Sequence, residues 1–110
     1  VIVSNHGGRQ IDAGESAIRS LLPIAAKYRG KLRVMIDSGL RTGPDVARAV
    51  ACGAEFTFLG RTFMYSVAAL GRDGGQHAMA TLKVQLRQVM DQLCCHRVAD
   101  LPRHLLRTPG

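Results

Sequence analysis

The chain has 110 residues and an ordinary globular composition, with 46% hydrophobic and 21% charged residues. No apolar run approaches the roughly 20 residues that a membrane-spanning helix requires, so we expect no transmembrane segment. The net charge is +7, but the basic residues are scattered, aromatic residues are few and no known nucleic-acid-binding module is present, so we expect no nucleic-acid partner.

The first half of the chain alternates apolar runs with a helical pattern. Residues 1–3 are predicted to end a strand, and residues 11–14 to form a loop. Residues 15–27 are predicted to form a helix because apolar side chains recur at the 3.6-residue spacing of a helix. The residues on this face are Ile18, Leu21, Leu22 and Ala25. The apolar, β-branched run 32–36 predicts the next strand.

The second half continues the alternation. Pro44 suits the first turn of a predicted helix over 44–51, and Gly53 ends it. Its inner face would carry Val46, Ala49 and Val50. A strand is predicted over 55–59 and a short helix over 63–70. Together these segments predict a β-α-β-α-β-α order, which is typical of a parallel sheet with crossover helices.

A longer helix is predicted over 76–94, separated from the preceding one by Gly74 and Gly75. It carries an apolar stripe that we interpret as core. The stripe consists of Met79, Leu82, Leu86, Val89, Met90 and Leu93. After Asp100 we expect one short turn and a fraying end.

The cysteines are Cys52, Cys94 and Cys95. An odd number with two adjacent members is not typical of a disulfide framework, so we expect reduced thiols and a cytoplasmic protein. His96 follows the adjacent pair, but no second ligand pair matches it, so we expect no metal site. We interpret these thiols as small apolar groups at a helix end.

The most informative motif is the run Ser4-Asn5-His6-Gly7-Gly8-Arg9-Gln10, directly after the first strand. His6 can exchange a proton near neutral pH, and Arg9 can bind a carboxylate through two parallel hydrogen bonds. The glycines allow close approach of a ligand to the backbone. The motif therefore predicts a site that binds a small carboxylic acid and moves its proton. A loop histidine bonded to backbone and an ordinary surface arginine are the alternatives.

Two further motifs follow the later strands. Asp37 ends the second strand, where its carboxylate can face His6 across the ends of the strands; a helix-capping role is the alternative. Ser38-Gly39-Leu40-Arg41 and Gly60-Arg61 each combine glycine with arginine. Backbone N–H groups, a following helix N-terminus and arginine charge are what a phosphate site needs. These motifs predict a phosphate site.

These motifs, in this order, resemble those of the FMN-dependent α-hydroxy acid dehydrogenases and oxidases, and the resemblance extends to about Leu105. That family includes L-lactate dehydrogenases, glycolate oxidases and mandelate dehydrogenases. The resemblance implies an α/β fold that is the C-terminal portion of a (β/α)8 TIM barrel. Because such a barrel needs about 250 residues, we expect residues 1–110 to be one fragment of a longer enzyme, one that forms a homo-oligomer.

The resemblance also implies roles for the site residues. His6 would be the catalytic base, Asp37 its catalytic partner and Arg9 the ligand of the substrate carboxylate. The remaining motif residues would bind FMN. These FMN-binding residues are Ser4, Asp37, Ser38, Gly39, Arg41, Gly60 and Arg61.

The implied reaction is oxidation of an L-2-hydroxy acid, with L-lactate first among candidates, to the 2-keto acid. Two alternatives stay open: an oxidase of the glycolate or mandelate type, and a truncated, non-catalytic fragment that binds FMN or phosphate. The electron acceptor is also open, as is peripheral attachment to the inner membrane.

Overall fold

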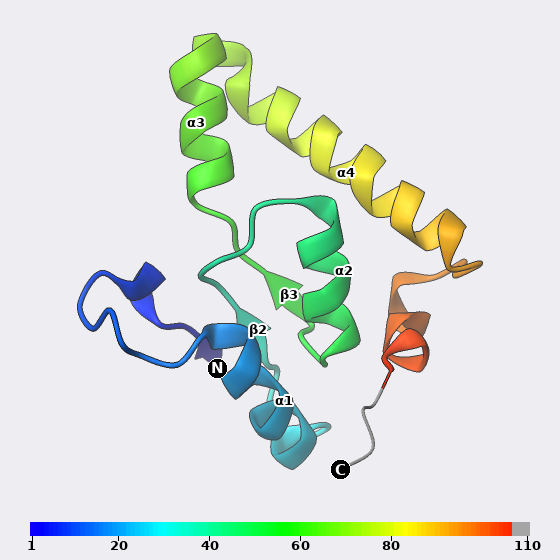
Figure 1. Cartoon of the computed structure of the whole chain (residues 1–110). Helices are drawn as coiled ribbons and strands as arrows, with labels where there is room; N and C mark the ends of the chain where they lie inside the picture. Colours follow the sequence, from blue (N-terminus) through cyan, green and yellow to red (C-terminus); the bar gives the residue numbers. More distant parts are fainter. Residues whose placement is uncertain (107–110) are drawn as a thin grey trace.

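A small parallel sheet lies at the centre of the molecule. The computed structural model describes residues 1–106. The strands are β1 (Ile2–Val3), β2 (Met35–Ile36) and β3 (Phe56–Thr57), and their order in the sheet follows the chain (Figure 1). Both pairings are parallel. A (β/α)8 barrel has this sequential order, whereas a doubly wound sheet reverses it. The predicted α/β fold with three parallel strands is confirmed.

Helices connect the strands and continue beyond them. They are α1 (Ala17–Tyr28), α2 (Gly43–Ala51), α3 (Arg61–Leu70) and α4 (Gly74–Gln92), with the short 3-10 segments η1 (His6–Gly8), η2 (Gly71–Asp73) and η3 (Val98–His104). In Figure 1, α3 and α4 form a hairpin, and α4 runs back past α2. The 3-10 segment η3 packs on α2.

One face of the sheet forms the main core with α1. Val3 and Ile36 are paired neighbours on this face, and both are buried. They belong to a cluster with Leu21 and Ala25 of α1. Because successive residues of a strand point to opposite faces, Ile2, Met35 and Phe56 line the other face.

That second face is largely uncovered in this chain. Ile2 is 49% exposed and Phe56 is 55% exposed. The Phe56 ring packs on that of Phe58, with centroids 5.0 Å apart. Apolar residues on both faces are typical of a barrel strand, whose inner face is covered by the other strands. The uncovered face therefore agrees with a portion of a barrel.

The strands are shorter than predicted. The predicted strand over 32–36 begins only at Met35, because the N–H groups of Lys31 and Leu32 bond to the Tyr28 carbonyl and close the end of α1. The predicted strand over 55–59 is regular only at Phe56 and Thr57.

The helix boundaries also differ from the prediction. α1 begins at Ala17 rather than at residue 15, because Ser16, at the N-cap position, has an extended backbone. α3 begins two residues early, at Arg61. Gly74 and Gly75 lie inside α4 rather than before it, and a Cβ on Gly74 would clash with the Ser66 carbonyl of α3.

Part of the predicted apolar stripe on α4 is confirmed as core. Leu82 is buried. Leu86, Val89 and Met90 pack on a second cluster formed by Ala47, Cys95 and Leu101. The prediction was wrong for Met79 and Leu93, which are 46% and 38% exposed, and for Leu22 of α1, at 45%. After Asp100, the predicted turn is part of η3, and the predicted fraying at 107–110 lies outside the described residues.

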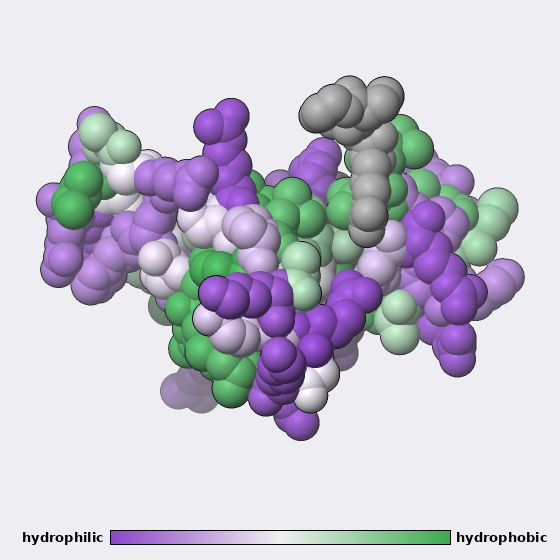
Figure 2. Space-filling view, turned by 90° about the horizontal axis from the view of Figure 1, so that it is seen from below, coloured by the Kyte–Doolittle hydropathy of each residue, from purple (hydrophilic) through white to green (hydrophobic). Residues whose placement is uncertain are grey.

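The end of the molecule below α1 carries several of the basic residues. They are Lys27, Arg29, Lys31 and Arg33, between the last turn of α1 and β2. Figure 2, seen from this side, shows many hydrophilic side chains around hydrophobic areas. These residues precede β2, whereas the candidate site residues follow the strands. Within residues 1–106, no helix is both long and apolar enough to cross a membrane.

Candidate active site

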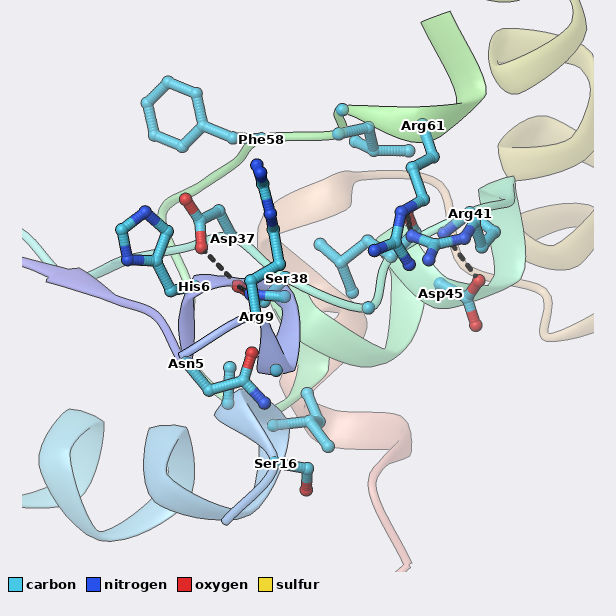
Figure 3. Close-up of a pocket in the computed structure, with 18 of the residues that line it drawn as sticks. Asn5, His6, Arg9, Ser16, Asp37, Ser38, Arg41, Asp45, Phe58 and Arg61 are labelled. Atoms are coloured by element: carbon cyan, nitrogen blue, oxygen red, sulfur yellow. Dashed lines mark hydrogen bonds between the residues drawn. The ribbon is translucent and has the colours of Figure 1, made fainter. Parts of the chain in front are cut away.

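A cavity of about 740 Å³ opens at the carboxyl ends of the three strands (Figure 3). The loops after β1, β2 and β3 all contribute to its lining. Its volume is in the range of small-ligand sites, which is about 300 to 1,000 Å³. All predicted site residues except Ser4 line it. Four arginines (Arg9, Arg41, Arg48 and Arg61) and two aspartates line the cavity, so positive charge prevails.

The loop after β1 makes a tight left-handed turn. His6, Gly7 and Gly8 have φ values of 58°, 65° and 71°. Glycine adopts this region without cost, whereas a residue with a side chain is strained there by about 1 to 2 kcal/mol. Backbone hydrogen bonds from Gly8 to Asn5 and from Arg9 to His6 close the turn. The glycines thus let the chain reverse and present His6 and Arg9 at the cavity.

A chain of hydrogen bonds joins this loop to the loop after β2. The Ser38 hydroxyl donates to Asp37 Oδ1 at 2.7 Å. Because a serine hydroxyl has one proton, the Ser4 hydroxyl is the donor in its 3.2 Å contact with Ser38. The His6 backbone N–H donates to Ser4 Oγ at 3.1 Å. The bonds therefore run in one direction, from the His6 backbone to the Asp37 carboxylate.

Figure 3 shows His6, Asp37 and Arg9 together at one end of the cavity, with Phe58 beside them. The structure thus brings the three predicted acid–base and carboxylate-binding residues into one place. In the part of the chain that the structure describes, no hydrogen bond joins the His6 imidazole to the Asp37 carboxylate. The catalytic roles of the three residues stay predictions.

Arg41 and Arg61 lie together at the other end of the view in Figure 3. Gly39, with a φ of 82°, and Gly60 also line the cavity, and a Cβ added to either would meet nothing within 4 Å. A guanidinium nitrogen of Arg61 lies 3.9 Å from the Cβ position of Gly7, so this side chain reaches back toward the first loop. Open space next to two glycines and two arginines fits a bound phosphate group.

The N-termini of α2 and α3 differ in how their free N–H groups are used. At α2, Asp45 Oδ2 accepts from the backbone N–H groups of Arg41 and Thr42, both at 3.0 Å. At α3, Gly60 is the capping residue, with no side-chain cap and no acidic residue in the first turn. Free N–H groups at a helix start attract anions. The N-terminus of α3 is therefore the better of the two for a phosphate.

Asp45 stays ionised at the edge of the cavity. Partial burial raises the pKa of Asp45. This effect is outweighed by hydrogen bonds from the Arg41 backbone and from the side chain and backbone of Thr42, and by the charge of Arg48. The pKa of Asp45 is therefore lowered overall. The Arg48 guanidinium is 3.0 Å from Asp45 Oδ1. The Asp45 carboxylate thus neutralises part of the arginine charge at the cavity and also caps α2.

Sequence reasoning gave no role to three residues that line the cavity, Asn5, Asp45 and Phe58, or to Thr62, which bonds to the lining residue Arg41. Asp45 belongs to a Thr-x-x-Asp pattern, which signals a helix cap and was detectable. Thr62 follows Gly60-Arg61 directly, and Phe58 follows β3 directly. Asn5 lies within the first motif, and its buried Oδ1 has no hydrogen-bond partner.

The cysteines were predicted to be packed thiols. This is confirmed for Cys95, which is buried and whose thiol donates to the Arg97 carbonyl, but Cys94 is exposed. Cys52 is partly buried, and burial raises the pKa of its thiol. Among residues 1–106, no group of three or more histidine, cysteine or acidic side chains is placed to hold a metal ion.

Residues 1–108 match the family model described as FMN-dependent dehydrogenase. The chain is 42% identical over 106 residues to an L-lactate dehydrogenase of Vibrio cholerae serotype O1 (strain M66-2), covering 96% of this chain. It covers only 28% of that relative, so it spans less than a third of the length of the curated protein that it matches.

Solved structures of mandelate oxidase are similar to this chain at 38% identity. One contains benzoyl-formic acid; it gives a TM-score of 0.87 over 93% of this chain and 30% of its own. Another, of a mutant with the monooxide FMN adduct, also gives 0.87 over 93% of this chain and 32% of its own. The chain therefore agrees in fold with about a third of each of these structures.

Proposed function

This chain belongs to the FMN-dependent dehydrogenase family, and on that premise we propose that it forms the C-terminal part of an enzyme that oxidises an L-2-hydroxy acid, L-lactate first among candidates, to the 2-keto acid. The observation that carries the proposal is one cavity with His6, Arg9 and Asp37 at one end and Arg41 and Arg61 at the other. A hydroxy acid fits the first end, and the phosphate of FMN fits the second.

The residues present fit FMN at the phosphate end. Gly39 and Gly60 leave open space beside the cavity, and the N-terminus of α3 carries no acidic residue or side-chain cap. Arg41 and Arg61 would neutralise the phosphate charge. When bound, FMN supplies the two-electron acceptor that none of the amino-acid side chains provides.

At the other end, the chain binds the substrate and takes its proton. Arg9 binds the carboxylate through its planar guanidinium, which fixes the orientation of the α-carbon. His6 removes a proton, either from the α-hydroxyl group or from the α-carbon, and both routes require a base at this position. Asp37 stabilises the imidazolium that forms. The hydrogen-bond chain through Ser4 and Ser38 holds the His6 backbone in place relative to Asp37.

Replacement of the proposed base tests this function in the complete enzyme. In His6→Gln we expect FMN to stay bound, because His6 lies away from the phosphate end, while anaerobic flavin reduction by L-lactate slows about 10²- to 10⁴-fold. The control is His77→Gln, an exposed residue of α4 outside the cavity. A near-normal reduction rate in His6→Gln would contradict the proposed mechanism.

An oxidase of the same family is a second candidate, favoured by the structural similarity to mandelate oxidase. Reoxidation of the reduced enzyme by oxygen separates the two: rapid reoxidation indicates an oxidase, and slow reoxidation indicates a dehydrogenase with another acceptor.

A non-catalytic fragment that binds FMN is a third candidate, because the chain spans only 28% of its curated relative. Saturable binding of FMN to the 110-residue chain without reduction by any hydroxy acid would favour it.

A further inference from the structure

Thr62 connects the two loops of the phosphate end. It lies in the first turn of α3, and its hydroxyl donates to the Arg41 carbonyl with an oxygen–oxygen distance of 2.7 Å. The two residues are 21 positions apart and follow different strands. Within residues 1–106, this is the one hydrogen bond that joins the segment 37–43 to the segment 58–64.

The other side of Arg41 is held as well. Its backbone N–H donates to Asp45 Oδ2 at 3.0 Å. A guanidinium nitrogen of Arg41 also donates to the Leu40 carbonyl at 3.2 Å. The backbone of Arg41 is thus fixed on both sides, by Asp45 from α2 and by Thr62 from α3.

This arrangement matters because the sheet stops short of the site. The last backbone bond between β2 and β3 runs from the Phe58 N–H to the Ile36 carbonyl. Beyond it, the Thr62 hydroxyl provides the direct hydrogen bond between Arg41 and the N-terminus of α3, in addition to the packing of α2 and α3 on α4. A site for a phosphate gains affinity when its donors are held in place before the ligand binds.

We propose that Thr62 is a positioning residue that holds Arg41 and the N-terminus of α3 as one preformed cradle for a phosphate monoester. This inference rests on the proposed function, in which that ester is the phosphate of FMN. Thr62 acts through Arg41, because its hydroxyl is already bonded to that carbonyl. Its loss is therefore expected to weaken binding of the phosphate and to leave contacts elsewhere in the cavity unchanged.

The test compares FMN with riboflavin, which lacks the phosphate, by titration of the complete enzyme freed of flavin. Thr62→Val removes the hydroxyl at nearly constant volume. We expect its Kd for FMN to rise up to about tenfold, as for the loss of one partly buried hydrogen bond, with the Kd for riboflavin unchanged. Thr62→Ser keeps the hydroxyl and should restore FMN binding.

The matched control is Ser20→Ala, which removes another 2.7 Å hydroxyl bond, to Glu15, outside the cavity. It should change neither Kd. Thr62→Ala removes the same hydroxyl in a residue that favours helices, and it replaces Thr62→Val if that variant folds poorly.

The outcomes separate this inference from the function on which it rests. An unchanged Kd for FMN in Thr62→Val overturns the positioning role alone, and so does equal weakening of FMN and riboflavin, which would indicate a general structural effect. A wild-type enzyme that does not prefer FMN to riboflavin overturns the phosphate site itself, and the inference with it.

Discussion

The Gly7 backbone N–H donates a hydrogen bond of 3.1 Å to the Ser38 hydroxyl oxygen, so that the loop after β1 rests on the loop after β2. Ser38 itself has a φ of 76°, which is unusual for a residue with a side chain. The hydroxyl of this strained serine contacts Gly7, Ser4 and Asp37 at once. Ser38 therefore contributes by holding the loops, and its predicted contact with FMN stays a prediction.

Replacing Ser38 separates its hydrogen bonds from its backbone strain. Ser38→Ala loses the bonds and keeps the strain, whereas Ser38→Gly loses the bonds and relieves the strain. We expect Ser38→Ala to be the less stable of the two by about 1 kcal/mol, because the left-handed region disfavours a Cβ. Urea unfolding measures the difference. A glycine variant less stable than the alanine variant would contradict the strain at this position.

Asp45 predicts a pH dependence of stability. Its pKa is lowered in the folded chain, so its contribution is present above the unfolded pKa and is lost as the pH falls through the folded pKa. Asp45→Asn should cost roughly 1 kcal/mol near neutral pH, as for loss of a helix cap. The difference from wild type should shrink as the pH falls below about 4. Urea unfolding across this range provides the measurement.

The control for Asp45 is Asp12→Asn, which changes an exposed loop residue outside the cavity. Its difference from wild type should stay near zero throughout. A constant difference for Asp45→Asn down to pH 3 would show that its carboxylate does not stabilise α2.

Gly74 and Gly75 are adjacent in α4 but differ in their surroundings. A Cβ on Gly74 would clash with the backbone of Ser66 and Val67, whereas one on Gly75 would meet nothing within 4 Å. Gly74→Ala should therefore destabilise the protein by about 1 to 3 kcal/mol, because the helices must separate. Gly75→Ala should be neutral or stabilising by up to about 1 kcal/mol, because alanine favours a helix.

Thermal unfolding of these two variants provides the measurement, and each is the other's control. Equal Tm values for Gly74→Ala and Gly75→Ala would contradict the close packing of α3 on α4.

The element order was predictable because the apolar pattern alternates along the chain. Leu21 and Ala25 recur at helical spacing, and both are buried on the sheet as expected. Boundaries were less predictable because they depend on which partner an N–H group finds. The N–H of Leu32 bonds to Tyr28 and so ends α1 instead of starting β2. The exposure of Met79 was not predictable, since periodicity identifies an apolar face and not what covers it.

The sequence by itself determined which side chains follow the strand ends: a histidine, an arginine and an aspartate, with two glycine–arginine pairs. Local spacing is enough for this, because parallel strands present their carboxyl ends at one edge. Only the tertiary structure decided how these residues are held. The bond from Thr62 to Arg41 and the chain from His6 to Asp37 join segments 21 and more residues apart. Such contacts depend on strand register and helix placement, which no local pattern encodes.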